Sequence, residues 1–224
     1  MDIKKIIEVL SFIKKAHYQA YLVGGSSRDF LLGRNFKDID IATNAPIHWI
    51  IKNFKVENDD GLSMGSIKIV YHNLLMEITQ FREEEYTEKS SFPKIKKFLQ
   101  TPEEDAQRRD FTINALYLDL TNQEIIDPFE GIKDLFTYQV RFIGHPATRI
   151  KEDPSRILRG LRLSQKLNFQ IEENTKEAFF QFQDELKRLS KNKLKKEIEK
   201  MKEDIGEIKT NFILDQYHLT NLIK

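Results

Sequence analysis

Two aspartates separated by a single isoleucine, Asp38 and Asp40, are the first residues whose types and spacing suggest chemistry. Residues 38–42 alternate polar and apolar side chains, which predicts a half-buried strand. Residues two apart on a strand project from the same face of a sheet, with Cα atoms about 6.5–7 Å apart. Carboxylates that close repel one another unless a cation lies between them, and such oxygen ligands suit Mg²⁺. The pair therefore predicts a magnesium site, and two solvated acids on an exposed strand are the alternative.

A glycine pair, Gly24 and Gly25, lies shortly upstream of these aspartates and is followed by two serines and Arg28. The apolar run 20–23 predicts a short strand that ends at the glycines, and a short helix is expected over 28–32. A helix N-terminus with side-chain-free backbone attracts anions, and Arg28 adds a positive charge. The glycines could alternatively serve only the dihedral angles of a turn. Beside two metal-binding carboxylates, a phosphate-binding turn indicates a site for metal-dependent nucleotidyl transfer.

Glu77 is the candidate for a third carboxylate of this site. Residues 66–71 and 75–81 are rich in β-formers and predict a hairpin, which places Glu77 on its second strand. That strand could lie beside the strand that carries Asp38 and Asp40. The alternative for Glu77 is an outward-facing polar residue of an alternating strand.

The elements that must position these residues form a mixed α/β unit. Apolar residues at helical spacing predict an amphipathic helix over residues 1–15. Residues 82–104 are charged and show no sustained period, so a mobile loop is expected there. A helix is expected over 105–116, and from about residue 147 onward the pattern is helical. We therefore expect a catalytic domain over 1–145 and a helical domain over 146–224.

Composition excludes several classes of protein. The 224 residues include no cysteine, which rules out disulfides, thiolate metal sites and cysteine nucleophiles. The 36 basic and 35 acidic residues nearly cancel, so any polyanionic partner must be bound by local charge. No stretch reaches the roughly 20 apolar residues that span a bilayer. We expect a soluble, cytoplasmic protein with no membrane partner.

Four segments resemble, in the same order, motifs of class II tRNA nucleotidyltransferases (CCA-adding enzymes) and bacterial poly(A) polymerases. The first consists of LVGGSSRDFLLG, which begins at residue 22, and KDIDIAT, which begins at residue 37. The other three are RRDFTINAL, DPFEGIKDL and EDPSRILRGLR, which begin at residues 108, 127 and 152. The resemblance implies an α+β fold with a nucleotidyltransferase-type mixed-sheet head followed by an all-helical neck. The body and tail domains of full-length members would be largely absent.

The resemblance also implies roles for residues that match these motifs. Asp38 and Asp40 would bind Mg²⁺, while Gly25 and Arg28 would contact the triphosphate. Arg109 and Asp110 would lie at the ribose and phosphates of the nucleotide. Residues of the last motif would read the base or add positive charge toward phosphate or RNA: Asp153, Arg156, Arg159 and Arg162. Because these four are three residues apart, they wind around a helix, and Arg162 fits a solvated face best.

The implied reaction is template-independent addition of CMP or AMP from CTP or ATP to the 3′ end of tRNA, with release of pyrophosphate. One alternative is a poly(A) polymerase that adds AMP to other RNA 3′ ends. Another is a non-catalytic remnant that binds RNA or nucleotide. A partner subunit or an oligomer could replace the missing C-terminal domains.

A cluster of basic residues near the C-terminus is the candidate RNA-binding surface. Between 187 and 202 there are eight Lys or Arg and two Glu, and the members proposed to contact RNA are Lys187, Arg188, Lys191, Lys193, Lys195 and Lys196. The alternative is a solvated amphipathic helix with i,i+4 ion pairs, such as Lys193 with Glu197 and Lys195 with Glu199.

Overall fold

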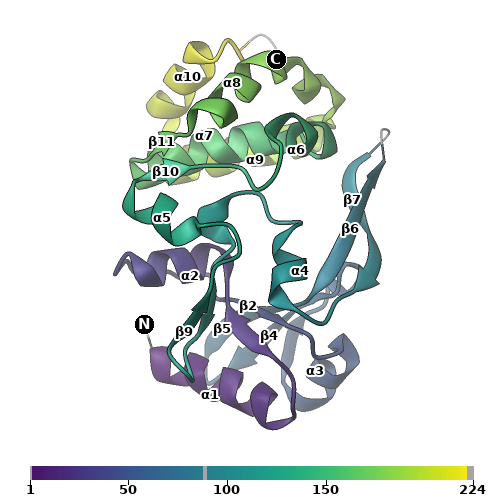
Figure 1. The fold of residues 1–224 in the computed structure, drawn as a ribbon. Coiled ribbons are helices and arrows are strands. Elements are labelled where there is room, and N and C mark those ends of the chain that lie inside the picture. Colours follow the sequence, from purple (N-terminus) through teal and green to yellow (C-terminus); the bar gives the residue numbers. More distant parts are fainter. Residues whose placement is uncertain (1, 88–89, 221–224) are drawn as a thin grey trace. The chain divides into compact units, whose positions relative to one another are not determined.

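The computed structural model describes residues 2–87 and 90–220 (Figure 1). The chain divides into two compact units. The first comprises Met1–Glu85, Lys94–Arg109 and Ile113–Ile132, and the second comprises Tyr86–Pro93, Asp110–Thr112 and Lys133–Lys224. Within the described residues, no helix combines the length and apolar character needed to cross a bilayer.

The first unit is built on a seven-stranded mixed sheet in the order β3-β4-β5-β2-β1-β8-β9. Its strands are β1 (Ala20–Leu22), β2 (Asp40–Thr43), β3 (Val56–Asn58), β4 (Ser66–Tyr71), β5 (Leu74–Gln80), β8 (Tyr117–Asp119) and β9 (Glu124–Ile126). The strands β2 and β5 are parallel, and the other neighbours are antiparallel. The predicted hairpin of β4 and β5 and the expected mixed sheet are confirmed.

Helices α1 (Ile3–Lys15) and α3 (Ile47–Asn53) contribute to the core of this unit, and α2 (Gly24–Leu31) follows β1 directly. The predicted amphipathic helix is confirmed, because Ile6, Leu10 and Ile13 of α1 are fully buried. They pack in one cluster with inward-facing strand residues such as Ile41 and Ile78. Since side chains alternate along a strand, the neighbours of these two isoleucines, Asp40 and Glu77 among them, face the other side of the sheet.

The prediction of a mobile loop over 82–104 is wrong. Strands β6 (Arg82–Thr87) and β7 (Ser90–Phe98) pair in a two-stranded sheet, and α4 (Pro102–Ala106) follows. Residues 88 and 89 lie outside the described residues. Glu83 on β6 contacts Lys96 at 2.6 Å and Lys97 at 3.4 Å, both on β7. Charge complementarity between strands, which a search for hydrophobic periodicity does not detect, accompanies this pairing.

The prediction of a helix over 105–116 is also wrong. Helix α4 ends at Ala106, and only a 3₁₀ turn, η2 (Thr112–Asn114), follows before residue 116. Phe111 pairs in an isolated β-bridge with Phe142, and their rings stack at a centroid distance of 4.9 Å. Burial of Phe111 against Phe142 therefore outweighs the local helical preference.

The second unit is mainly helical, with one two-stranded parallel sheet. Its elements are β10 (Gln139–Val140), α6 (Pro146–Glu152), α7 (Ser155–Leu167), β11 (Gln170–Ile171), α8 (Glu173–Gln181), η3 (Gln183–Arg188), α9 (Lys191–Ile205) and α10 (Glu207–Gln216). The remaining elements are η1 (Leu62–Met64), in the first unit, and α5 (Gly131–Phe136). Helix α7 is central and packs along α9. Gly160 of α7 lies so close to the ring of Phe179 that an added Cβ would meet it at 2.5 Å.

Candidate active site

The glycine turn lies against Asp40. Helix α2 begins at Gly24, which has a φ of +69°, so the glycines form the first turn of the helix rather than a loop before it. A Cβ at Gly24 would lie 3.0 Å from Oδ2 of Asp40. The Ser26 hydroxyl donates to the carbonyl of Val23 at 2.7 Å and accepts from the Asp40 backbone N–H at 3.2 Å. The start of the helix and the start of β2 are therefore fixed to one another.

Asp40 begins β2 and is the register partner of Glu77 on the parallel strand β5. Asp38 is exposed and precedes the strand, which starts two residues later than predicted. Burial, followed by the charge of Glu77 and then that of Asp38, raises the pKa of Asp40 to about 6. Arg109 and Arg28 act in the opposite direction. The charges of the other two predicted carboxylates therefore act on Asp40.

This arrangement suits a divalent cation that takes part of its coordination from a substrate. In the part of the chain that the structure describes, no three His, Asp or Glu side chains form a group that could hold a metal ion. Mg²⁺ in proteins commonly takes one or two carboxylates, with waters and substrate phosphates as its other ligands. A carboxyl group whose ionisation is opposed by its neighbours is stabilised by such a cation. The chemistry of Asp40, with the charges of Asp38 and Glu77 acting on it, therefore suits such an ion, and its binding by Asp38 and Asp40 stays a prediction.

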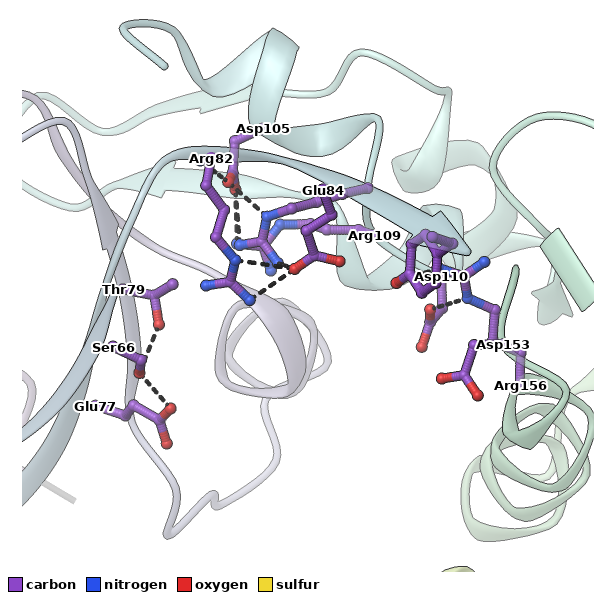
Figure 2. Close-up of polar contacts among 12 residues, drawn as sticks. Ser66, Glu77, Thr79, Arg82, Glu84, Asp105, Arg109, Asp110, Asp153 and Arg156 are labelled. Carbon is purple, nitrogen blue, oxygen red and sulfur yellow. Dashed lines mark hydrogen bonds and ion pairs between the residues drawn. The ribbon is translucent and has the colours of Figure 1, made fainter. Parts of the chain in front are cut away.

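Glu77 is held by a hydroxyl group from the adjacent strand. Its Oε1 accepts a hydrogen bond from Ser66 Oγ at 2.5 Å, and Ser66 Oγ lies 3.1 Å from Thr79 Oγ1 (Figure 2). Ser66 is the register partner of Thr79, so both residues lie on the face that carries Glu77. Sequence reasoning did not identify Ser66.

Arg28 and Arg109 bring positive charge to Asp40, since both lower its pKa. The buried guanidinium of Arg28 contacts Asp29 at 2.8 Å and donates to Asn114 Oδ1 at 2.7 Å. Asn114 belongs to the segment RRDFTINAL, so this bond joins two of the predicted motifs.

Asp105, which no sequence motif singles out, is the centre of a buried polar cluster (Figure 2). Its side chain is fully buried and accepts hydrogen bonds from Arg82 N, Arg108 Nε and Nη2, Arg109 Nη2 and Tyr117 Oη. Glu84 joins this cluster by pairing with Arg82 at 2.7 Å and with Arg108 at 3.3 Å. Spacing in the sequence does not identify Asp105, because its partners come from three segments of the chain, at residue 82, residues 108–109 and residue 117.

In the second unit, acidic and basic side chains alternate along one continuous series of contacts. The members in order are Lys193, Asp153, Arg159, Asp110, Arg156, Glu152 and Arg149. We call this series the charge ladder. It brings together four of the predicted nucleotide-binding residues, namely Asp110, Asp153, Arg156 and Arg159.

Arg156, the predicted base reader, is 1% exposed and fully engaged within this ladder. Its guanidinium donates to Asp110 at 2.7 Å, to Glu152 at 2.5 Å and to the carbonyl of Arg149 at 2.7 Å. A further bond of 3.1 Å reaches the Tyr86 hydroxyl. Asp153 accepts from Ser155, Arg159 and Lys193. A base that pairs with Arg156 or Asp153 must therefore replace some of these contacts.

Comparison with known proteins assigns this chain to a family. Residues 20–141, more than half of the chain, match the model of the poly A polymerase head domain. The chain belongs to the poly A polymerase head domain family. This confirms the resemblance that its four motifs indicated.

Relatives of this family member are named CCA-adding enzymes. One from Enterococcus faecalis is 40% identical over 200 residues, which are 89% of this chain and 49% of that protein. One from Streptococcus agalactiae is 42% identical over 177 residues, which are 79% and 44% of the respective chains. This chain therefore spans about half the length of the curated relatives it matches.

Solved structures of CCA-adding enzymes share the fold of this family member. The Bacillus stearothermophilus CCA-adding enzyme in complex with CTP is 31% identical with a TM-score of 0.84, and the match covers 96% of this chain and 52% of that one. A tRNA nucleotidyltransferase complexed with a primer tRNA and an incoming ATP analogue is 26% identical with a TM-score of 0.76, at 96% and 62% coverage.

Two basic residues of this poly A polymerase head domain protein form ion pairs within the second unit. Lys193 belongs to the charge ladder, where its Nζ donates to Asp153 at 2.9 Å and to the Ser91 carbonyl at 2.8 Å. Its Nζ is thus engaged by these two acceptors, and among the described contacts it does not form the pair with Glu197 that the alternative of a solvated helix predicts. Arg162 contacts Asp204 of α9 at 3.0 Å, which gives it a role in packing α7 on α9.

The other predicted RNA-binding residues lie near the protein surface. Lys187 pairs with Asp184 at 2.7 Å and Arg188 with Glu185 at 2.6 Å, while Lys191 and Lys196 are exposed. Lys195 contacts Glu199 at 3.8 Å, which is one of the i,i+4 pairs expected under the alternative of a solvated helix. These residues keep positive charge at the surface of η3 and α9.

Proposed function

We propose that this chain carries the catalytic head of a template-independent RNA nucleotidyltransferase that adds CMP and AMP from CTP and ATP to the 3′ end of tRNA. The observation that carries the proposal is the contact of the Gly24 turn with Asp40, opposite Glu77 on the neighbouring strand. Relatives at about 40% identity that are named CCA-adding enzymes support the same activity.

In the proposed reaction, the 3′-hydroxyl oxygen of the RNA attacks the α-phosphorus of the nucleotide. A new O–P bond forms, the bond to the β-phosphate oxygen breaks, pyrophosphate leaves, and the hydroxyl proton is lost to solvent. Asp38 and Asp40 would hold Mg²⁺, and Glu77 would add a third negative charge. Mg²⁺, when bound, would lower the pKa of the acceptor hydroxyl and neutralise charge on the triphosphate.

The triphosphate would lie at the first turn of α2. Gly24 and Gly25 leave the backbone N–H groups of this turn accessible, and the helix dipole favours an anion there. Arg28 and Arg109 would supply the positive charge. Both already act on Asp40 electrostatically, which supports a common site for metal and phosphates.

Nucleotide selection and RNA binding would fall to the helical part of the chain. We assign catalysis to residues 1–145, and base reading and RNA contact to 146–224. Asp153 and Arg156 would pair with the base once the charge ladder opens, while Asp110 and Arg159 would hold them in place. The basic surface residues of η3 and α9 would contact the RNA backbone.

A partner subunit or an oligomer would supply further contacts to the tRNA. Such an assembly would work in the cytoplasm, together with its tRNA acceptor.

A poly(A) polymerase is the second candidate, since the matching family model bears that description, but the relatives named CCA-adding enzymes do not favour it. The two activities differ in nucleotide use, since only CCA addition needs CTP.

Incubation of the purified protein with tRNA lacking its CCA end, Mg²⁺ and one nucleotide at a time tests the proposal. CMP incorporation followed by AMP incorporation supports CCA addition, and AMP addition alone with long tails supports the second candidate. Asp40→Asn should abolish incorporation of either nucleotide. Incorporation by the Asp40→Asn protein, or none by the wild type, would overturn the proposed function.

A further inference from the structure

The guanidinium of Arg109 donates two hydrogen bonds and also lies over an aromatic ring. Its Nε donates to the Tyr117 hydroxyl at 2.8 Å, and its Nη2 donates to Asp105 Oδ2 at 3.1 Å. The centre of the guanidinium also lies 5.0 Å from the centre of the Tyr117 ring. A planar cation bound at several points loses its rotational freedom, so the direction of Arg109 is set by these two residues.

Tyr117 and Asp105 form a buried pair behind Arg109. Both are completely buried, and the Tyr117 hydroxyl donates to Asp105 Oδ2 at 2.7 Å. The same hydroxyl thus donates to the carboxylate and accepts from the guanidinium. Burial alone would raise the pKa of Asp105, but Arg108 and Arg109 hold it well below its usual range. Asp105 is therefore a permanent anion that fixes both the hydroxyl proton and the cation.

Arg109 is the member of this trio that reaches solvent. Its side chain is 14% exposed, whereas that of Asp105 is 0% exposed. Its positive charge also acts on Asp40, where it lowers the pKa. Tyr117 lies on β8, which pairs with β1, and β1 leads directly into the first turn of α2. A buried anion and a buried hydroxyl therefore hold this cation next to the strand that leads into the proposed phosphate site.

A tyrosine is not required at position 117 for packing alone. The ring lies edge-on to Tyr21 at 6.0 Å and to Phe81 at 6.2 Å, and a phenylalanine would fill the same space. What phenylalanine cannot do is donate to Asp105 and accept from Arg109. The hydroxyl therefore has a function that the apolar contacts leave unexplained.

We propose that Tyr117 and Asp105 are positioning residues that fix the Arg109 guanidinium for the phosphates of an incoming nucleoside triphosphate. This inference rests on the proposed function, because it assumes that nucleotides bind beside Asp40.

Tyr117→Phe is the decisive variant, since it removes one oxygen atom and keeps the ring. Asp105 is less suitable because its carboxylate also accepts from the backbone N–H of Arg82, at the start of β6. Tyr21→Phe is the matched control, because Tyr21 packs in the same aromatic group while its hydroxyl donates to Gln19. The Kd of CTP by calorimetry and the KM and kcat of CMP incorporation are measured for each variant.

We expect Tyr117→Phe to raise the Kd and KM for CTP about three- to tenfold, with kcat within about twofold of the wild type. Tyr21→Phe should change each value less than twofold. In an Arg109→Lys background, Tyr117→Phe should have little further effect, because the positioned group is already lost. An unchanged Kd in Tyr117→Phe, an equal loss in Tyr21→Phe, or additive losses in the double variant would each overturn the inference.

A measurement on the wild type covers the case in which Tyr117→Phe does not fold. The Nε proton of Arg109 should exchange slowly with water by NMR, since it donates to a buried hydroxyl, and fast exchange would contradict the inference. The proposed function fails separately: a wild-type protein that neither binds CTP nor incorporates CMP overturns both proposals. Wild-type activity with a normal Tyr117→Phe variant overturns only this one.

Discussion

Gly24 and Asp40 are in such close contact that the space for a side chain at position 24 is already taken by the carboxylate: an added Cβ would lie 3.0 Å from Oδ2. The absence of a side chain therefore serves two purposes, a φ of +69° and access to Asp40. Gly33 allows these two purposes to be tested separately. It has a similar φ of +65°, but no atom lies within 4 Å of the position that an added Cβ would take.

Gly24→Ala and Gly33→Ala should destabilise the protein to a similar extent, about 1–2 kcal/mol each, because both place alanine in the left-handed region. Only Gly24→Ala should also reduce nucleotide incorporation, by more than about tenfold, since its methyl group displaces the Asp40 carboxylate. Urea unfolding and the incorporation assay check the two effects. Equal activity in both variants would show that access to Asp40 does not matter.

Asp40→Asn should stabilise the fold in metal-free buffer at neutral pH. The pKa of Asp40 rises from 3.8 to about 6 on folding, so the folded protein binds this proton more tightly than the unfolded chain does. The free energy of unfolding of the wild type therefore falls as the pH rises from about 4 to about 6. The asparagine variant does not undergo this loss. Above that pH range its free energy of unfolding should therefore exceed that of the wild type by about 1–3 kcal/mol.

Urea titrations of both proteins at pH 4.5 and 7.5, with EDTA, measure this difference. It should grow with pH and shrink when Mg²⁺ is added to the wild type, because the cation stabilises the charged carboxylate. A difference that is independent of pH would show that Asp40 ionises without cost.

Arg159 and Arg162, three residues apart on α7, should respond differently to replacement by glutamine. Arg159 contacts Asp110 at 3.0 Å and Asp153 at 2.9 Å, so its loss leaves two carboxylates without a shared cation. Arg159→Gln should alter the ratio of CMP to AMP incorporation. Arg162→Gln should leave that ratio unchanged and lower stability by about 1 kcal/mol, because Arg162 pairs with Asp204. Competition assays with both nucleotides decide the point, and identical ratios in the two variants would contradict it.

Joint replacement of Lys191 and Lys196 by alanine should weaken tRNA binding about three- to tenfold at low salt. Both residues are exposed on α9, and each lost phosphate contact should make the affinity less dependent on salt. Filter binding between 50 and 200 mM salt measures this, with the exposed Lys52 of α3 as a control position. If the salt dependence does not change, these lysines do not contact RNA.

Residues whose roles depend on local spacing were the ones that the sequence could predict. The placement of Gly24 beside Asp40 follows from a strand, a turn and a second strand close together in the chain. The sheet, the first helix and the hairpin of β4 and β5 show clear periodicity and were predicted correctly. The roles of the individual site residues remain predictions.

Residues whose roles depend on distant partners could not be found in this way. Ser66 contacts Glu77 from a neighbouring strand, and the partners of Asp105 come from three segments of the chain. Lys193 was assigned to the surface because its neighbours in sequence are basic, yet its partner Asp153 lies 40 positions away. The hairpin of β6 and β7 escaped prediction because its strands match by charge rather than by hydrophobic alternation.

Under the proposed function, the charge ladder of the second unit would restrict how nucleotide preference can change. Each interior member touches one group of opposite sign on either side, so replacing a single acid leaves two neighbouring cations facing each other. Exchanging one residue to accept a different base would therefore disturb members that never meet that base. Engineered variants with a new preference should need compensating substitutions in adjacent pairs, and libraries that vary Asp153 or Arg156 alone would miss them.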